Sequence, residues 1–435
     1  MIPEAVARAT SQDDVIQVLE IAANEKSAVT PAGSQTSMTG ASITSTGTLL
    51  SLAGMNRIVD VDVERRTARV EPGVTIGQLN RELAGVGLMF APDPTSEQDA
   101  TIGGAIACNA SGARSLYYGS TRRHVKAVRV VHADRMVTEY RRSNHEKNTV
   151  GYAAAQDPVD WFVGSEGTLG IVTEAELSLV PLPSHIVGLA IPFLQESDAL
   201  KFVVAARDGS AGRTPRCLEF FDETALGIAG ESIGAPWATY TTALIYLEDD
   251  AGETGDTEPM LSAWLEMADE HGVLTDDIRA FDGAQALREA RVMRHAVPAT
   301  MNERGAAYHK NGGRKISTDW AVPHQLLGEA LAASRTAIER HGVPAPVTYG
   351  HAGNGHPHQN FIAEDLDAVN TIYKAIDETL RAVISMGGTV SAEHGLGKLK
   401  QFWLPLQVSP RQIEVMRALK STLDPSAMLS PGNIL

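Results

Sequence analysis

The residues best suited to chemistry lie in a short segment near the C-terminal end of the sequence. Gly350–Asn360 reads GHAGNGHPHQN and places His351, His356 and His358 within eight residues. Neutral imidazole is a suitable ligand for Zn²⁺ or Mn²⁺. The intervening glycines permit the tight turns that would bring the rings together. A single histidine is more often an ordinary polar residue, but this clustering favours a metal site.

A second segment, Ser391–Lys398, reads SAEHGLGK and supplies a carboxylate, Glu393, next to a further histidine, His394. Two histidines and one glutamate would leave coordination positions open for a substrate, as in catalytic rather than structural metal sites. The HExxH motif of zinc hydrolases is absent from the sequence. A zinc hydrolase built on the histidine segment is nevertheless a competing interpretation.

Three loops rich in small residues precede these segments. They run through Pro31–Gly40, Pro92–Gly112 and Gly164–Thr173. Small residues let the backbone approach a flat ligand closely, and successive N–H groups in a tight turn can bind anionic oxygens. The spacing matches neither the Rossmann fingerprint nor the P-loop. An ordinary polar loop stays an alternative for the first of the three.

Taken in order, the three loops resemble those of the FAD-linked oxidases of the vanillyl-alcohol oxidase and p-cresol methylhydroxylase superfamily. The shared pattern is P-x-G…T-S, then P-D-P…T-I-G-G-x-I-A…N-A-x-G…Y-G, then G-S-E-G-T-L-G-I-V-T, and Lys147–Tyr152 resembles the segment before the third loop. The resemblance implies a non-covalently bound FAD. The residues that it implies as FAD contacts are Pro31, Gly33, Ser34, Gln35, Thr36, Ser37, Pro92, Asp93, Thr101, Ile102, Gly103, Gly104, Asn109, Gly112, Gly119, Glu166, Gly170, Ile171 and Asn433.

The histidine segment is similar to the H-x-G-D-G-N-x-H-x-N motif of the D-lactate, glycolate and D-2-hydroxyglutarate dehydrogenase branch, and Ser391–Lys398 matches the same branch. The resemblance implies a divalent metal, Zn or Mn, and a substrate contact and a general base nearby. The implied metal ligands are His351, His358 and Glu393, the substrate contact is Asn360, and the base is His394.

This sequence departs from the branch motif at two positions. Asn354 replaces the usual Asp, and His356 replaces the usual Asn. Whether His356 is a metal ligand, an outer contact or neither stays open at this point.

An anionic substrate needs cationic partners, and Arg can form bidentate contacts with a carboxylate. The segments Arg294–Pro298 and Lys315–Pro323 resemble those that supply an Arg and a Lys to the substrate in this branch. Arg291 competes with Arg294 for the role, and the spacing to Pro298 favours Arg294.

Composition limits the partners of the 435-residue chain. Its formal net charge of −16 disfavours nucleic acid. Its two cysteines are too few for an iron–sulfur cluster, so electrons from reduced FAD must pass to an external quinone, cytochrome, electron-transfer flavoprotein or partner subunit. No signal peptide or spanning apolar stretch is visible. We expect a cytoplasmic protein, with a peripheral membrane position and homodimerisation left open.

The predicted elements divide the chain near Pro181–Ser184, where two prolines interrupt regular structure. We expect an α+β protein: a two-part FAD-binding domain of p-cresol methylhydroxylase type over 1–182, and a C-terminal domain over 183–435. The latter combines a ferredoxin-like cap with an antiparallel sheet at about 184–380 and a tail, 385–435, that returns to the flavin. Its predicted strands and helices are Ile186–Phe193, Ser197–Arg207, Arg216–Phe221, Thr239–Leu247, Glu258–Glu270 and Leu274–Phe281.

These expectations combine into one predicted reaction, the oxidation of a 2-hydroxy acid of D configuration to the 2-oxo acid by hydride transfer to flavin N5. The alternative within the same fold is an FAD oxidase that acts on a sugar lactone or alcohol with O₂.

Overall fold

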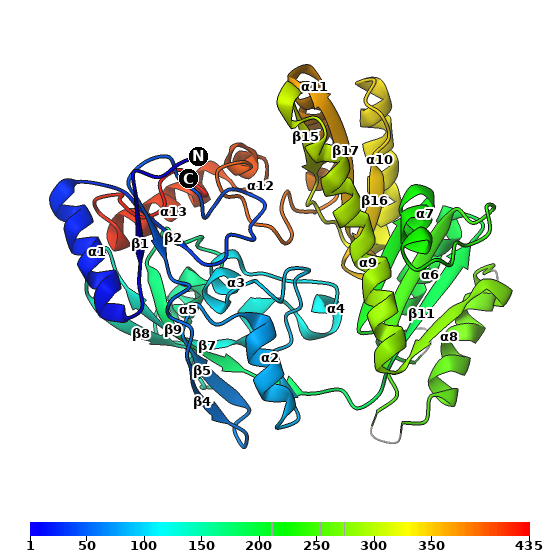
Figure 1. Ribbon diagram of the computed structural model, residues 1–435, viewed down its shortest axis with the longest axis horizontal. Helices are drawn as coiled ribbons and strands as arrows, with labels where there is room; N and C mark the ends of the chain where they lie inside the picture. The colour runs from blue at the N-terminus through cyan, green and yellow to red at the C-terminus, as the bar shows by residue number, and fades with distance from the viewer. Residues whose placement is uncertain (210–211, 253–254, 274) are drawn as a thin grey trace. The chain divides into compact units, whose positions relative to one another are not determined.

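The computed structural model describes residues 1–209, 212–252, 255–273 and 275–435 (Figure 1). The chain forms two compact units. The first unit consists of Met1–Gly112, Tyr118–Leu182 and Glu393–Leu435, and the second consists of Ala113–Tyr117 and Pro183–Ala392.

The first unit begins with a small parallel sheet in the order β1 (Ala5–Arg8), β3 (Thr48–Ser51), β2 (Val29–Ala32). Helix α1 (Gln12–Glu25) starts at a capping box in which Ser11 and Asp14 each bond to the other's backbone N–H. Its buried residues Val15, Leu19 and Ala22 share a core with β2 and β3.

A five-stranded antiparallel sheet forms the rest of this unit, together with short helices. Strand β9 alternates between buried and half-buried residues along its length, the period-2 pattern of a sheet with one face on a core. The sheet order is β4 (Ile58–Asp62), β5 (Thr67–Val70), β9 (Ile171–Ser178), β7 (Val125–Val131), β8 (Val137–Arg141). The other elements are α2 (Ile76–Ala84), β6 (Leu88–Met89), α3 (Ile102–Cys108), α5 (Val159–Phe162), β10 (Val180–Pro181), α12 (Leu404–Gln407) and α13 (Pro410–Leu423).

The second unit is built on one seven-stranded sheet in which every neighbouring pair is antiparallel. Its order is β14 (Arg279–Asp282), β11 (Ile186–Phe193), β13 (Ala243–Asp250), β12 (Cys217–Asp222), β16 (Val347–His351), β17 (His356–Asp365), β15 (Gly312–Ser317).

Helices cover both faces of this sheet. On one face, α7 (Glu223–Ser232) and α9 (Gly283–Ala306) share a core with Phe221 and Tyr246. The opposite face contacts α10 (Leu327–Arg340), where Ser334 donates to Gln359 of β17 over 2.8 Å. The helices of that opposite face are α6 (Glu196–Arg207), α8 (Glu258–Glu270), α10 (Leu327–Arg340) and α11 (Leu366–Ser385).

The expected fold class, an α+β protein with an antiparallel sheet and helices in its second part, is confirmed. Two strand predictions were wrong in extent. Strand β13 begins at Ala243, because Thr241 N–H closes a turn onto Ala238. The predicted strand 274–281 is shorter in the structure. Leu274 lies outside the described residues, and Thr275–Asp277 forms a 3₁₀ turn because adjacent aspartates disfavour strands. Only β14 is extended.

The units also differ in detail from the predicted boundaries. Residues Ala113–Tyr117 group with the second unit, where Arg114 pairs with Glu248. The tail that groups with the first unit begins at Glu393 rather than at 385, because Thr389 and Ala392 still bond to the backbone of the second unit. No helix within the described ranges has the length and hydropathy needed to cross a membrane.

Candidate functional site

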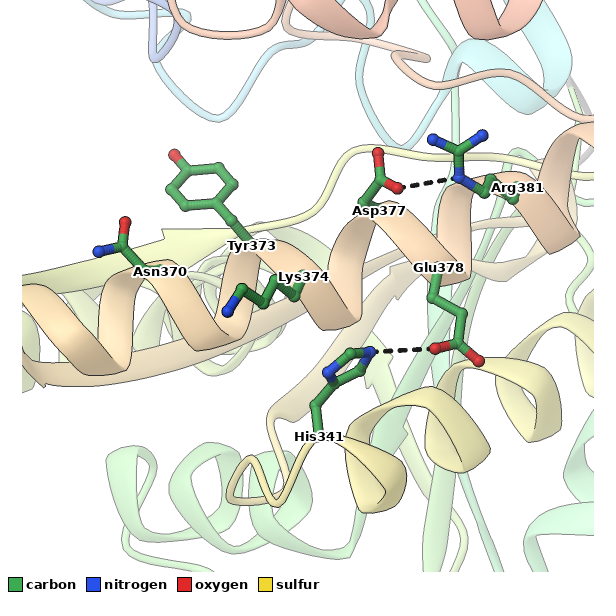
Figure 2. A pocket seen from close by; sticks show the side chains of 7 residues that line it. All are labelled: His341, Asn370, Tyr373, Lys374, Asp377, Glu378 and Arg381. Atoms are coloured by element: carbon green, nitrogen blue, oxygen red, sulfur yellow. Dashed lines mark hydrogen bonds and ion pairs between the residues drawn. The ribbon is translucent and has the colours of Figure 1, made fainter.

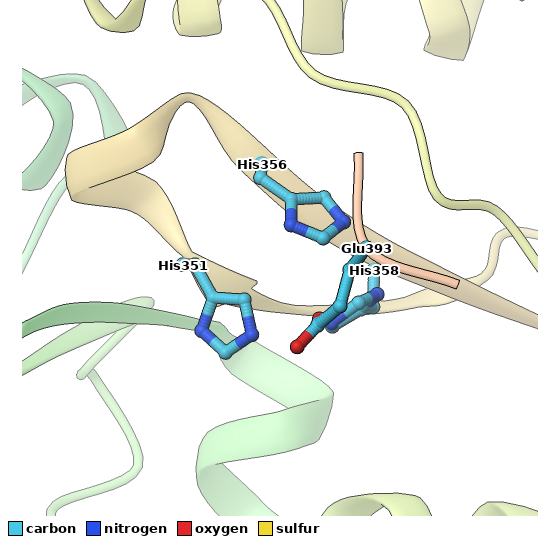
Figure 3. A group of neighbouring side chains, drawn as sticks. All are labelled: His351, His356, His358 and Glu393. Carbon is cyan, nitrogen blue, oxygen red and sulfur yellow. The ribbon is translucent and has the colours of Figure 1, made fainter. Parts of the chain in front are cut away.

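The three clustered histidines lie on one face of the β16–β17 hairpin. His351 pairs directly with His356 in the sheet register, and His358 is two residues further along β17. Residues that are opposite in register or two apart in a strand share a face of the sheet. The candidate ligand atoms of the three rings lie within 4.8 Å of one another. Figure 3 shows the rings turned toward one another.

Glycines make this hairpin possible. Gly355 ends the 3₁₀ turn Ala352–Asn354 with φ of +63°. A Cβ at Gly355 would lie 1.9 Å from the carbonyl oxygen of Val322, so no other residue fits without displacing the backbone. The segment between the histidines therefore fixes the turn that aligns their strands.

Two buried carboxylates lie behind the histidines. Glu219 Oε1 is 2.8 Å from Nδ1 of His351, and Asp319 Oδ1 is 3.2 Å from Nε2 of His356. Asp319 also accepts a hydrogen bond from Ser391 over 2.5 Å. Metal-bound histidines typically have a carboxylate or carbonyl on the ring nitrogen that does not bind the metal. This arrangement leaves Nε2 of His351 and Nδ1 of His356 for a metal.

A buried charge network continues along the same sheet face. Glu248 accepts from Arg114 at 2.9 Å, Arg216 at 3.3 Å and Tyr246 at 3.1 Å. Burial alone would raise the pKa of Glu248, but Arg114, Arg294 and Arg216 lower it to about 2. Glu248 therefore carries its charge throughout the physiological range.

Arg294 projects from α9 into this network. Its guanidinium lies 3.5 Å from Glu219 and 3.9 Å from Glu248, and these neighbours raise its pKa although burial opposes them. Its Nε is buried and makes no hydrogen bond within the described residues. That edge is what remains for an anionic ligand. Arg291, the competing candidate, is exposed on the same helix.

Lys315 and Asn360 share the face of the histidines, because Ser317 pairs with Asn360 and Lys315 pairs with Ile362. Burial lowers the pKa of Lys315. Asn360 is 1% exposed, and neither its amide oxygen nor its amide nitrogen has a hydrogen-bond partner among the described residues. Each buried, unsatisfied polar group costs about 1–3 kcal/mol. An amide left in this state indicates a place for a polar ligand.

In the first unit, glycines bring the three loops into contact with one another. A Cβ on Gly33 would lie 2.1 Å from Thr101 Oγ1, one on Gly167 would lie 2.6 Å from Pro31, and one on Gly112 would lie 2.2 Å from the Asp93 carbonyl. These glycines let the loops pack closely against one another, which suits a cofactor held mainly by backbone groups.

The C-terminal tail fastens this loop cluster. The Glu166 carboxylate accepts the N–H groups of Leu396 and Gly397 over 2.8–3.0 Å, and burial raises its pKa. Asn433 donates to Ala41 and to the Glu166 carbonyl, and it accepts from Lys398 over 2.7 Å. Both side chains, predicted as FAD contacts, thus hold the loops together.

The other predicted residues fall on or beside these loops. Thr101 caps α3, whose first turn contains Ile102, Gly103 and Gly104, and Asn109 ends it in the left-handed conformation. Gln35 has φ of +56° in the first loop and bonds to the Ser42 carbonyl. Pro31 lies in β2 and Ile171 begins β9, with Gly170 before it. Gly33, Ser34, Thr36, Ser37, Pro92, Asp93, Gly112 and Gly119 lie in the connecting turns.

Glu393 and His394 open the tail segment of the first unit. Glu393 directly follows Ala392, whose N–H donates to the Asp319 carbonyl over 2.7 Å. The backbone carbonyl of His394 accepts from Thr39 Oγ1 over 3.3 Å. Their roles as ligand and base stay predictions.

Sequence reasoning missed the buried carboxylates Glu219, Glu248 and Asp319. A signal was available, because Glu219 lies inside the apolar run Cys217–Phe221, and Glu248 ends the apolar run from Ala243. A buried charge in such a strand requires a partner.

A separate groove of about 520 Å³ lies between α10 and α11 (Figure 2). Two ion pairs lie within it, Glu378 with His341 over 3.0 Å and Asp377 with Arg381 over 2.9 Å. These helices cover the sheet face opposite the histidines, so the groove is not the candidate site. The residues that line it are His341, Asn370, Tyr373, Lys374, Asp377, Glu378 and Arg381.

Comparison with known proteins gives two family matches. Residues 3–140 match the FAD binding domain, and residues 182–434 match the C-terminal domain of FAD linked oxidases. The chain is 32% identical to the glycolate oxidase subunit GlcD of Bacillus subtilis, covering 100% of this chain and 89% of that protein. It is 31% identical to a D-lactate dehydrogenase of Archaeoglobus fulgidus, covering 99% and 91% respectively.

Among solved structures, an alkyldihydroxyacetonephosphate synthase aligns with a TM-score of 0.71 at 18% identity, over 98% of this chain and 76% of that one, which shows a shared fold. The loop motifs, the two domain matches and the full-length relatives agree. The chain therefore belongs to the FAD-linked oxidases and is an FAD-dependent oxidoreductase.

Proposed function

We propose that this enzyme oxidises a short 2-hydroxy acid of D configuration, such as D-lactate, glycolate or D-2-hydroxyglutarate, to the 2-oxo acid. The names of its full-length relatives support the substrate class. The observation that carries the proposal is the sheet face of the second unit. It combines a histidine cluster suited to a metal with a cationic residue, Lys315, and an unsatisfied amide, Asn360.

The donor set fits a divalent metal, Zn or Mn. Imidazole nitrogens with carboxylates behind them are the environment that these metals use. His351 and His358 would be ligands, and Glu393 would be the third, as the resemblance to the branch implies. A bound metal would act as a Lewis acid that lowers the pKa of the substrate hydroxyl.

The chain's own residues would then orient the substrate and move its proton. Lys315 and the free Nε edge of Arg294 would hold the carboxylate, because both are partly buried cations on or above this face. Asn360 would hydrogen-bond the substrate. His394 would accept the hydroxyl proton, a role suited to an imidazole at neutral pH. When bound, FAD supplies the hydride acceptor.

An external electron acceptor must complete the cycle. The two thiols do not offer an internal redox centre, because burial raises the pKa of Cys108 to about 12 and that of Cys217 well above its ordinary value. A quinone, a cytochrome, an electron-transfer flavoprotein or a partner subunit could serve.

Anaerobic reduction of the flavin tests the substrate class. The FAD-loaded protein should lose its flavin absorbance with at least one D-2-hydroxy acid and not with the L enantiomer. Bleaching by a sugar lactone instead, followed by rapid reoxidation in O₂, would replace this proposal with the oxidase alternative. An absence of bleaching by every hydroxy acid tested would refute it.

A further inference from the structure

We propose that His356 is itself a metal ligand, so that this enzyme holds its metal with three imidazoles from the β16–β17 hairpin. The inference rests on the metal site of the proposed function. It goes beyond that site, because the branch motif has an asparagine at this position and assigns no third histidine.

The spacing of the rings supports a shared metal. The ring centres of His351, His356 and His358 are separated by 5.3, 5.2 and 4.5 Å. A metal about 2.1 Å from each nitrogen would lie roughly 3.2–3.3 Å from each ring centre, which places ring centres about 4.5–5.3 Å apart at ordinary coordination angles. His356 thus satisfies the same spacing as the two residues that the motif predicts.

The surroundings of His356 match those of His351. Each ring has a buried carboxylate beside one nitrogen, Asp319 for His356 and Glu219 for His351. Asp319 is 2% exposed and belongs to the loop after β15, whereas Glu219 comes from β12. A carboxylate in this position fixes the orientation of a ligating imidazole and increases its basicity.

A purely structural role explains His356 less well. The residue is 4% exposed, and its Nε2 makes no hydrogen bond of good geometry within the described residues although Asp319 lies 3.2 Å away. A histidine that served only to pair with Asp319 would form a well-aligned hydrogen bond to it. Coordination through Nδ1 accounts for both the burial and the orientation.

A third imidazole changes the metal preference. Sites rich in nitrogen favour Zn²⁺ or Co²⁺, whereas sites rich in oxygen suit Mn²⁺ or Mg²⁺. We therefore expect tighter binding of Zn²⁺ than of Mn²⁺, with the difference reduced when His356 is replaced.

The test compares His356→Asn, which restores the residue of the branch motif, with His341→Asn in the groove between α10 and α11. Zn²⁺ affinity is measured by competition with a chromophoric chelator, and FAD content is measured in parallel. His356→Asn should weaken Zn²⁺ binding at least roughly tenfold and Mn²⁺ binding less, with FAD content unchanged. His341→Asn should match the wild type.

Zn²⁺ affinity of His356→Asn within twofold of wild type would overturn the inference and leave the proposed metal site intact. X-ray absorption of the zinc-loaded wild type provides a second measurement that needs no variant. Three imidazoles in the zinc shell are expected, and two would overturn the inference. A wild type that binds no Zn²⁺ would refute the proposed metal site as well.

Discussion

Single residues on one sheet face of the second unit carry the chemistry that we propose. Glu219 connects the two parts of that face, since it contacts both His351 and Arg294. Its position between a candidate metal ligand and a candidate substrate-binding cation makes it a positioning residue.

Glu219→Gln should therefore weaken Zn²⁺ binding by roughly 10–100-fold, the usual effect of removing the carboxylate behind a ligating histidine. The glutamine amide keeps the size of the side chain, but only one of its two terminal atoms can accept a hydrogen bond, whereas both carboxylate oxygens of Glu219 can. Chelator competition measures the effect, with Asp377→Asn, which removes an exposed ion pair with Arg381, as the matched control. Unchanged affinity would mean that Glu219 does not support the metal site.

We expect the buried amide of Asn360 to lower the stability of the fold while it serves substrate binding. Asn360→Leu removes a buried amide that has no partner in the described residues, so the free energy of unfolding should stay equal or rise by about 1–2 kcal/mol. Flavin reduction by the hydroxy acid should fall sharply. Urea unfolding and anaerobic bleaching measure the two effects.

Asn80→Leu supplies the contrast, because Asn80 forms hydrogen bonds of 3.1 and 2.7 Å with the backbone of Phe90. This variant should lose about 1–3 kcal/mol of stability. If Asn360→Leu were destabilised as much as Asn80→Leu, the amide of Asn360 would have a structural role instead.

Sequence reasoning at this scale singled out the histidines, Lys315 and Asn360 from motifs, and the structure places them on one face of the sheet. It did not identify Asp319 or Glu219, because their importance depends on which histidine each carboxylate contacts in the folded chain. Glu219, for example, contacts His351 from a position more than a hundred residues earlier in the sequence. A local pattern carries no information about such register.

At the scale of elements, the hairpin and the buried charge network determine how the site is held. Gly355→Ala should disrupt the hairpin, since the new Cβ would lie 1.9 Å from a backbone carbonyl. We expect a loss of several kcal/mol, above the ~1–2 kcal/mol cost of a left-handed conformation. Gly342→Ala is the matched control, with φ of +64° and no heavy atom within 4 Å. Equal melting temperatures for the two variants would contradict the steric argument.

Glu248 should make the protein sensitive to acid. Its pKa is lowered from 4.5 to about 2 in the folded state, so its contribution is present above pH 4.5 and is lost as the pH falls toward 2. The corresponding free energy is about 3 kcal/mol. Glu248→Gln should lower stability at pH 7 by about 3–5 kcal/mol, because it leaves buried arginines without their carboxylate.

Denaturant unfolding between pH 7 and pH 2 measures this effect. Glu378→Gln, which removes a partly exposed ion pair, should cost under about 1 kcal/mol and keep the acid slope. An acid slope in Glu248→Gln as steep as in the wild type would show that other groups control the transition.

The elements themselves were predicted well where local signals are strong. Strand β11 and helix α8 have the bounds that the sequence predicts. The strand predicted over 274–281 was too long, because the prediction ran through the adjacent aspartates Asp276 and Asp277, which lie in a 3₁₀ turn. The assignment of 113–117 to the second unit depends on an ion pair that no local pattern reveals.

At the scale of the whole molecule, the two units are suited to different ligands. Backbone-rich loops in the first unit suit a cofactor, and polar side chains on a sheet in the second suit a substrate and a metal. The net charge of −16 matters for the binding of an anionic substrate, which most of the surface would repel. An acidic chain must concentrate Arg294, Lys315 and a metal locally to hold an anionic substrate.

The central claim is that a metal on the histidine face is required for flavin reduction by a 2-hydroxy acid. The most direct measurement follows anaerobic flavin bleaching by the preferred D-2-hydroxy acid in one FAD-loaded preparation, before chelation, after chelation and after Zn²⁺ or Mn²⁺ is restored. The rate should fall roughly a hundredfold or more on chelation, since a Lewis acid contributes several kcal/mol, and it should recover on restoration. An equal rate in the metal-free enzyme with FAD retained would contradict the account.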